Sequence, residues 1–293
     1  MGSLEEQAER LGNLCRSERN SSCESLEERV RALSPYPITY DVFGGQSVAF
    51  SEYTYTEFST GLWVTTQSVE LNARLMQLAL QCAPDRKALE AFTESISDKY
   101  VLNVPPQAAY PGGKICFMPG HNRMDVASVE NISRLMFEDA QVMIKPHPLT
   151  NADAVALLGK RFGWNRIIDA ACSGAMLLKA CKQVYTTSAS EMAITATALG
   201  KEVFNVSNFF HEGAGTYHPI SRLLFAAHKD GVKSAQDVLA KILGCDYSGI
   251  VFPHQDDIER RLTSYYAKTL HLKEKYRPIA CPIGASKELL HES

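Results

Sequence analysis

A histidine held between two prolines is the first group in this sequence that could bind an anion. The motif Lys145-Pro146-His147-Pro148 follows directly after the short apolar run 142–144. The prolines restrict the backbone on both sides of His147. An imidazole at a strand end can donate hydrogen bonds to a phosphate, and Lys145 can add positive charge. The alternative is a rigid turn with an exposed histidine, and the motif taken alone favours that alternative.

A run of hydroxyl side chains forms the second candidate, about forty residues further along the chain. The apolar pair 184–185 is followed by Thr186-Thr187-Ser188-Ala189-Ser190-Glu191, and a helical pattern then begins. The first turn of a helix has free N–H groups and favours anions. The alternative is that Ser188 or Ser190 only caps the helix, with Glu191 in its first turn. Together the two strand ends favour a nucleotide phosphate site at Lys145, His147, Thr187, Ser188, Ser190 and Glu191.

A third candidate follows the apolar run 114–118. Gly120 would allow the backbone to approach a ligand closely, and His121 could face a cleft between two domains. A simple loop explains these two residues equally well. His218-Pro219 repeats the His-Pro dipeptide, but it lies in an irregular stretch and not at a clean strand end, so it ranks lower.

A transfer reaction also needs a general base, which we expect in the first 110 residues. Gly44-Gly45 could approach an acceptor there. A carboxylate can act as the base, but nothing in the spacing selects one, and the residues alone favour a solvated surface position for each. The candidates are Asp41, Glu52 and Glu57.

Alternating short apolar runs and helical patterns are expected to position these residues. The runs cover 114–118, 141–144, 166–169, 183–185 and 202–206, and the helical patterns cover 126–137, 153–162, 174–182 and 191–199. Such alternation predicts a parallel sheet with right-handed crossovers. The fold class is therefore α/β, with ligands at the carboxyl ends of the strands.

One segment rich in proline and glycine divides the chain. Pro105-Pro106-Gln107 and Pro111-Gly112-Gly113 interrupt any regular element. We expect a first domain over 1–110 that holds Gly44-Gly45, a Rossmann-like domain over 111–250 that holds the nucleotide phosphate site, and a C-terminal helix and tail over 251–293.

Composition narrows the class of protein. The 293 residues, 45% of them apolar, suffice for two packed domains or one large one. Eight cysteines show no C-x-x-C pair and no D-x-D cluster is present, so we expect no metal and no cofactor. Residues 1–110 carry nine Lys and Arg against fifteen Asp and Glu, which does not favour nucleic acid as the main partner. No apolar run approaches the ~20 residues of a membrane span, and the acidic N-terminus is unlike a signal peptide. We therefore expect a cytoplasmic protein.

The order of these motifs over residues 113–210 resembles the C-terminal half of GT-B glycosyltransferases. The Lys-Pro-His-Pro turn, the hydroxyl run ending at Glu191 and the turn Gly200-Lys201-Glu202-Val203 are similar to motifs of bacterial capsule-polysaccharide Kdo transferases and bacterial sialyltransferases. The resemblance implies two Rossmann-like domains facing a cleft. It also implies a metal-independent enzyme, with the phosphate of a CMP-activated sugar held by His147, Thr187, Ser188 and Ser190. The acidic motif that supplies the base in the sialyltransferases has no match in residues 1–110.

The sequence therefore predicts a glycosyltransferase of polysaccharide biosynthesis. It would move a sugar from a nucleotide-activated donor, with a CMP-sugar favoured, to a glycan acceptor. Two alternatives stay open. One is a phage-type transferase acting on modified bases in DNA, which would need a basic groove. The other is a catalytically silent protein that binds nucleotide sugars.

Overall fold

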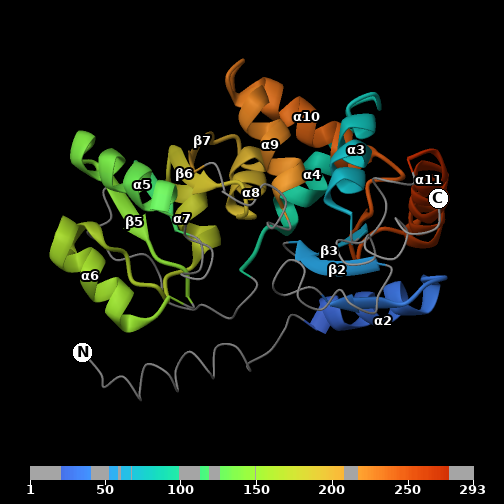
Figure 1. Ribbon diagram of the computed structural model, residues 1–293, viewed down its shortest axis with the longest axis horizontal. Coiled ribbons are helices and arrows are strands. Elements are labelled where there is room, and N and C mark those ends of the chain that lie inside the picture. Colours follow the sequence, from blue (N-terminus) through green and yellow to red (C-terminus); the bar gives the residue numbers. More distant parts are fainter. Residues whose placement is uncertain are drawn as a thin grey trace, which may run out of the picture. The chain divides into compact units, whose positions relative to one another are not determined.

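A computed structural model describes eight segments of the chain (Figure 1). They are residues 21–40, 53–58, 61–66, 68–98, 113–118, 126–148, 150–207 and 217–276. The predicted site residues Asp41, Glu52, Gly120 and His121 lie outside these segments, as does the predicted linker up to Gly112. Among the described residues, no helix is long and apolar enough to cross a membrane.

The described chain forms two compact units. The parallel-sheet unit comprises residues 92–236, and the mixed-sheet unit comprises residues 21–91 and 237–276. The chain passes from one unit to the other within helix α4 (Arg86–Ser95) and again within helix α10 (Val232–Gly244). The described part of the segment expected as a C-terminal appendage, 251–293, belongs to the mixed-sheet unit.

The parallel-sheet unit is built on four strands in the order β5-β4-β6-β7, and every neighbouring pair is parallel. The strands are β4 (Lys114–Phe117), β5 (Val142–Lys145), β6 (Gln183–Thr187) and β7 (Glu202–Ser207). The α/β class and the parallel sheet are confirmed. The strand expected over 166–169 is wrong, because this segment forms the 3-10 turn η3 (Trp164–Arg166) and a single bridge from Ile167 to Ile144.

Helices cover both faces of this sheet. They are α5 (Val126–Glu138), α6 (Ala152–Phe162), α7 (Gly174–Ala180), α8 (Met192–Ala198) and α9 (His218–His228). Successive residues of a strand point to opposite faces. Ile115 accordingly joins an apolar cluster with α7 and α8, while Cys116 joins a second cluster with Ile132 and Met136 of α5. Figure 1 shows α5 and α6 beside β5, and apolar side chains of both helices pack in this second cluster. The sheet is therefore the middle layer of three.

The mixed-sheet unit has strand order β1-β2-β3-β8. The strands β1 (Ile38–Tyr40) and β2 (Tyr53–Phe58) are parallel, whereas β3 (Gly61–Thr66) is antiparallel to both β2 and β8 (Ile250–Val251). Helices α2 (Ser21–Leu33), α3 (Val69–Ala79) and α11 (Ile258–Lys275) complete the unit. Ser68 caps the start of helix α3, because its Oγ accepts a hydrogen bond from the Leu71 N–H at 3.2 Å.

Candidate functional site

The strand order of the parallel sheet fixes where a ligand can enter. The connection from β4 leads to β5 on one side, and the connection from β6 leads to β7 on the other. The carboxyl ends of β4 and β6 are therefore a topological switch point, at which open α/β sheets form a crevice for their ligands. The two ends are joined directly, because the Thr186 Oγ1 donates to the Phe117 carbonyl oxygen at 3.4 Å.

The hydroxyl run after β6 lies at this switch point and is buried. Thr187 is 0% exposed and Ser188 is 2% exposed. The Ser190 N–H donates to the Thr187 carbonyl at 3.1 Å, so the chain turns sharply before α8 begins at Met192. Among the described residues, the Thr187 Oγ1 has no hydrogen-bond partner. A buried hydroxyl without a partner is costly, so this atom is suited to contact a bound group.

Two neighbours of Thr187 have different surroundings. The Ser190 Oγ accepts from the Met192 N–H at 3.2 Å, as a capping residue would. Glu191 is buried and precedes the helix, but its side chain makes no capping hydrogen bond. Ser190 therefore has the capping role that the sequence left open. The side chains of Thr187, Ser188 and Glu191 lie at the same turn but do not cap the helix.

The site includes one histidine that the sequence ranked low. His218 is the first residue of α9, is buried, and its Nδ1 lies 2.8 Å from the Ser188 Oγ. The pair joins segments thirty residues apart in the chain. The available signal was the proline that follows His218, since proline is favoured in the first turn of a helix. That signal places His218 at a helix start but does not show which strand end it meets.

Lys145 and His147 lie at the end of β5, on the other side of β4. The Lys145 Nζ is buried and donates to the Pro146 carbonyl at 2.9 Å and to the Ala170 carbonyl at 2.8 Å. Burial lowers the pKa of Lys145 to about 8. His147 is half-buried, and its carbonyl accepts from the Thr150 N–H at 2.9 Å. Two strand spacings separate this end from β6, about 10 Å. Phosphate binding by Lys145 and His147 stays a prediction.

The remaining candidate, Glu57, lies on β2 of the mixed-sheet unit. It pairs across the hairpin with Leu62 and is half-buried. Its role as a base stays a prediction, as do those of Asp41 and Glu52. Among the described residues, no group of three or more His, Cys, Asp or Glu side chains could hold a metal ion.

Comparison with known proteins does not assign this chain to a family, so its class is defined by its own fold. No family model matches the chain, and no curated protein matches it. One solved structure, a candidate UDP-N-acetylglucosamine 2-epimerase from Listeria monocytogenes, is 18% identical with a TM-score of 0.26. The match covers 75% of this chain and 55% of the other, so this chain spans about half the length of the solved structure. A TM-score this low supports no assignment. The sheet itself defines the class: an α/β protein with a parallel sheet and a buried polar cluster at its switch point.

Proposed function

We propose that the protein is a glycosyltransferase that binds a nucleotide-activated sugar at the carboxyl ends of β4 and β6. One observation carries the proposal. The Ser188–His218 pair and the hydroxyl of Thr187 are buried together at the switch point of a parallel sheet. Polar groups gathered at such a point are typical of a ligand site.

The chemistry of the cluster suits a phosphate. Phosphate oxygens accept hydrogen bonds, and hydroxyl and imidazole groups donate them. A protonated His218 would donate from both ring nitrogens, and His147 could approach the same anion from the end of β5. Donors placed in advance around a leaving phosphate stabilise the charge that develops during transfer. The carboxylate of Glu191 would instead accept a hydrogen bond from a ribose hydroxyl.

The donor and acceptor follow from the resemblance. The similarity to transferases with a His-Pro motif favours a CMP-activated sugar and a glycan acceptor. The general base would be Asp41, Glu52 or Glu57. Metal-independent transfer suits this arrangement, because side-chain donors can take the leaving phosphate without a cation.

Thr187→Val tests the phosphate site. Valine keeps the side-chain shape and removes a buried hydroxyl that has no described partner, so we expect stability without ligand to be unchanged or raised. Nucleotide-induced stabilisation should fall, measured by thermal unfolding with CMP, UDP, GDP and ADP.

His147→Ala should lower turnover of the accepted nucleotide sugar by ~10²-fold.

Thr197→Val is the matched control. The Thr197 hydroxyl is also buried, but it donates to the Ala193 carbonyl at 2.7 Å and lies 2.9 Å from the His228 Nε2. Its loss should cost about 1–3 kcal/mol and leave nucleotide affinity unchanged. A protein stabilised by none of the four nucleotides would rule out the donor site. Nucleotide binding without transfer would favour the catalytically silent alternative.

A further inference from the structure

A hollow lies at the edge of the parallel sheet opposite the proposed donor site. It has a volume of about 1220 Å³, and it is bordered by Lys114, Gln183 and Glu202, the first residues of β4, β6 and β7. We call it the amino-edge groove. Donor binding at the carboxyl ends of the strands does not account for it. Its volume exceeds the ~300–1,000 Å³ typical of small-molecule sites, so it has room for an extended ligand.

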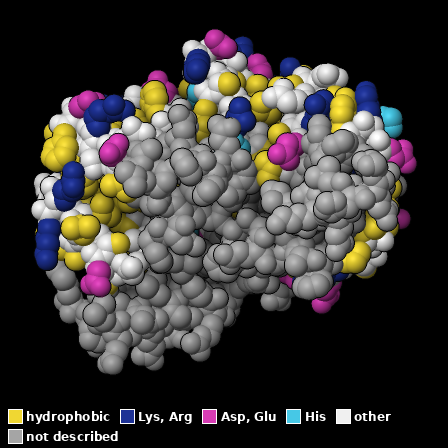
Figure 2. All heavy atoms as spheres, in the orientation of Figure 1, with side chains coloured by type: hydrophobic (Ala, Val, Ile, Leu, Met, Phe, Trp, Pro, Cys, Tyr) yellow, Lys and Arg dark blue, Asp and Glu magenta, His cyan; other side chains and the backbone are white. Residues whose placement is uncertain are grey.

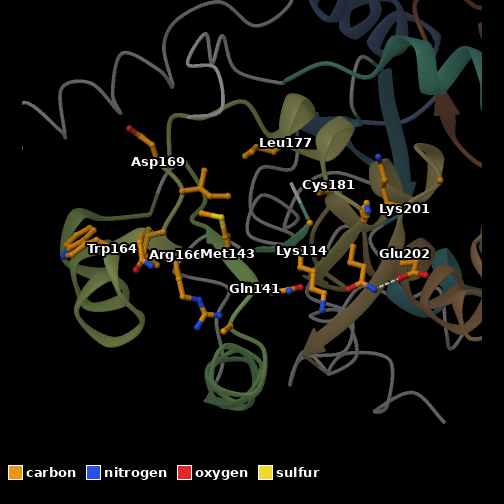
Figure 3. Close-up of a pocket in the computed structure, with 18 of the residues that line it drawn as sticks. Lys114, Gln141, Met143, Trp164, Arg166, Asp169, Leu177, Cys181, Lys201 and Glu202 are labelled. Carbon is orange, nitrogen blue, oxygen red and sulfur yellow. Dashed lines mark hydrogen bonds between the residues drawn. The ribbon is translucent and has the colours of Figure 1, made fainter. Parts of the chain in front are cut away.

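Trp164 forms one end of the amino-edge groove. A Cβ atom built on Gly159 of α6 would lie 2.5 Å from both Cδ2 and Cε2 of the Trp164 indole, so the ring lies against the glycine backbone. The residue nevertheless remains 49% exposed. Figure 3 shows Trp164 beside α6 at one end and Lys201 and Glu202 at the other. A ring held in place on one face is a stacking platform that loses little freedom when a ligand binds.

Four cations line the groove, and so do two carboxylates: Lys114, Arg166, Lys182 and Lys201 stand with Asp169 and Glu202. The Lys114 Nζ lies 2.5 Å from the Asp139 carboxylate. The Arg166 guanidinium donates to the carbonyls of Met136, Asp139 and Val142. The Lys201 Nζ donates to the Lys179 carbonyl at 3.0 Å. Bonds to carbonyls leave the charge in place, but Asp139, Asp169 and Glu202 offset most of it. The groove is therefore not the strongly basic surface that a polyanion needs.

Amide groups supply the remaining polar chemistry. Gln141, Asn165 and Gln183 line the groove, and the Gln183 Nε2 donates to the Glu202 carboxylate at 2.6 Å. Amides both donate and accept hydrogen bonds, which matches sugar hydroxyls. A pyranose ring also presents an apolar C–H face that can lie on an indole.

We infer that the amino-edge groove binds a neutral oligosaccharide, with one sugar ring stacked on Trp164. Single-stranded nucleic acid also stacks on aromatic rings, but it needs a positively charged groove to hold its phosphates. The near balance of cations and carboxylates in the groove argues against that occupant. The inference goes beyond the proposed transfer reaction and does not depend on it, because the two sites lie at opposite edges of the sheet.

Isothermal titration of the full chain without nucleotide tests the inference, with maltoheptaose, chitohexaose and a thymidine decanucleotide as probes. At least one saccharide should bind saturably below about 10 mM. Trp164→Ala should weaken that binding about tenfold, as expected for loss of one stacking partner. Phe137→Ala should leave it unchanged, since this aromatic residue of α5 is 69% exposed but does not line the groove.

Gly159→Ala provides a second variant that keeps the tryptophan. Alanine is favoured over glycine inside a helix, but its Cβ would occupy the space of the indole. The variant should stay folded and lose saccharide binding to a similar degree. Binding of the decanucleotide alone, binding of neither saccharide, or saccharide binding unchanged in both variants would overturn the inference. Failure of the nucleotide site would leave these results unaffected.

Discussion

Lys145 shows how burial changes the chemistry of one residue. The residue is 4% exposed, two backbone carbonyls accept hydrogen bonds from its ammonium group, and burial lowers its pKa from 10.5 to about 8. Between those two values the unfolded chain still carries the proton that the folded chain has lost. The free energy of unfolding must therefore rise with pH across this window.

Lys145→Met makes this dependence measurable. The stability of the wild-type chain relative to the variant should increase by about 2 kcal/mol between pH 7.5 and 9.5. Urea unfolding of both proteins at each pH gives the difference, in which the other titrating groups cancel. A stability difference that does not change with pH would contradict the prediction. It would mean that Lys145 keeps its proton throughout this range and remains a positive charge near His147.

At the scale of elements, Arg166 joins the end of α5 to the start of β5. Its guanidinium donates to the carbonyl of Met136 in the last turn of α5, to that of Asp139 directly after the helix, and to that of Val142. Carbonyls at a helix C-terminus lack partners within the helix. The side chain therefore satisfies groups of two elements at once.

Arg166→Lys should destabilise the parallel-sheet unit by about 1–3 kcal/mol, because an ammonium cannot reproduce the planar fork of donors. Chemical unfolding followed by hydrogen exchange of residues 126–145 measures the loss. Arg134→Lys is the control, since this exposed arginine of α5 donates a hydrogen bond to the Asn131 side chain and its replacement should change stability by less than about 0.5 kcal/mol. Equal losses in both variants would show that the carbonyl contacts contribute little.

The elements that the sequence predicted are those with local signals. The buried strands at Lys114, Val142 and Gln183 were predictable because each is a short apolar run between helical patterns. The segment 166–169 was not, since its apolar residues suggest a strand while Arg166 turns back to satisfy distant carbonyls. Contacts between segments far apart in the chain decide such cases.

Some residues of the candidate site also have local signals in the sequence, and others do not. The hydroxyl run after β6 and the His-Pro turn after β5 were found because strand ends are visible in the sequence. His218 was ranked low because its partner, Ser188, lies thirty residues earlier and no spacing rule links a helix start to a strand end. The residues of the amino-edge groove are also hard to predict. Figure 2 shows hydrophobic and basic side chains intermingled over α5 and α6. Phe137, Leu157 and Trp164 are all exposed large apolar residues, and no local signal in the sequence shows that only Trp164 lines the groove.

At the scale of the whole molecule, the mixed-sheet unit depends on two distant parts of the chain. The strand β8 pairs with β3, and the Trp63 Nε1 donates to the Ser248 carbonyl at 3.1 Å across 185 residues. Gly249 makes this junction possible. Its φ is +79°, and a Cβ there would lie 2.3 Å from the Val64 carbonyl oxygen.

Gly249→Ala should therefore destabilise the mixed-sheet unit selectively. A left-handed backbone costs a non-glycine residue about 1–2 kcal/mol, and the clash with Val64 adds to this cost. Gly231→Ala is the matched control, because its φ is +105° but no described atom lies within 4 Å of the added Cβ. Hydrogen exchange should show lost protection in residues 53–66 and 250–272 of the first variant, with residues 114–145 unchanged. Equal loss across both units would mean that the chain unfolds as one cooperative body.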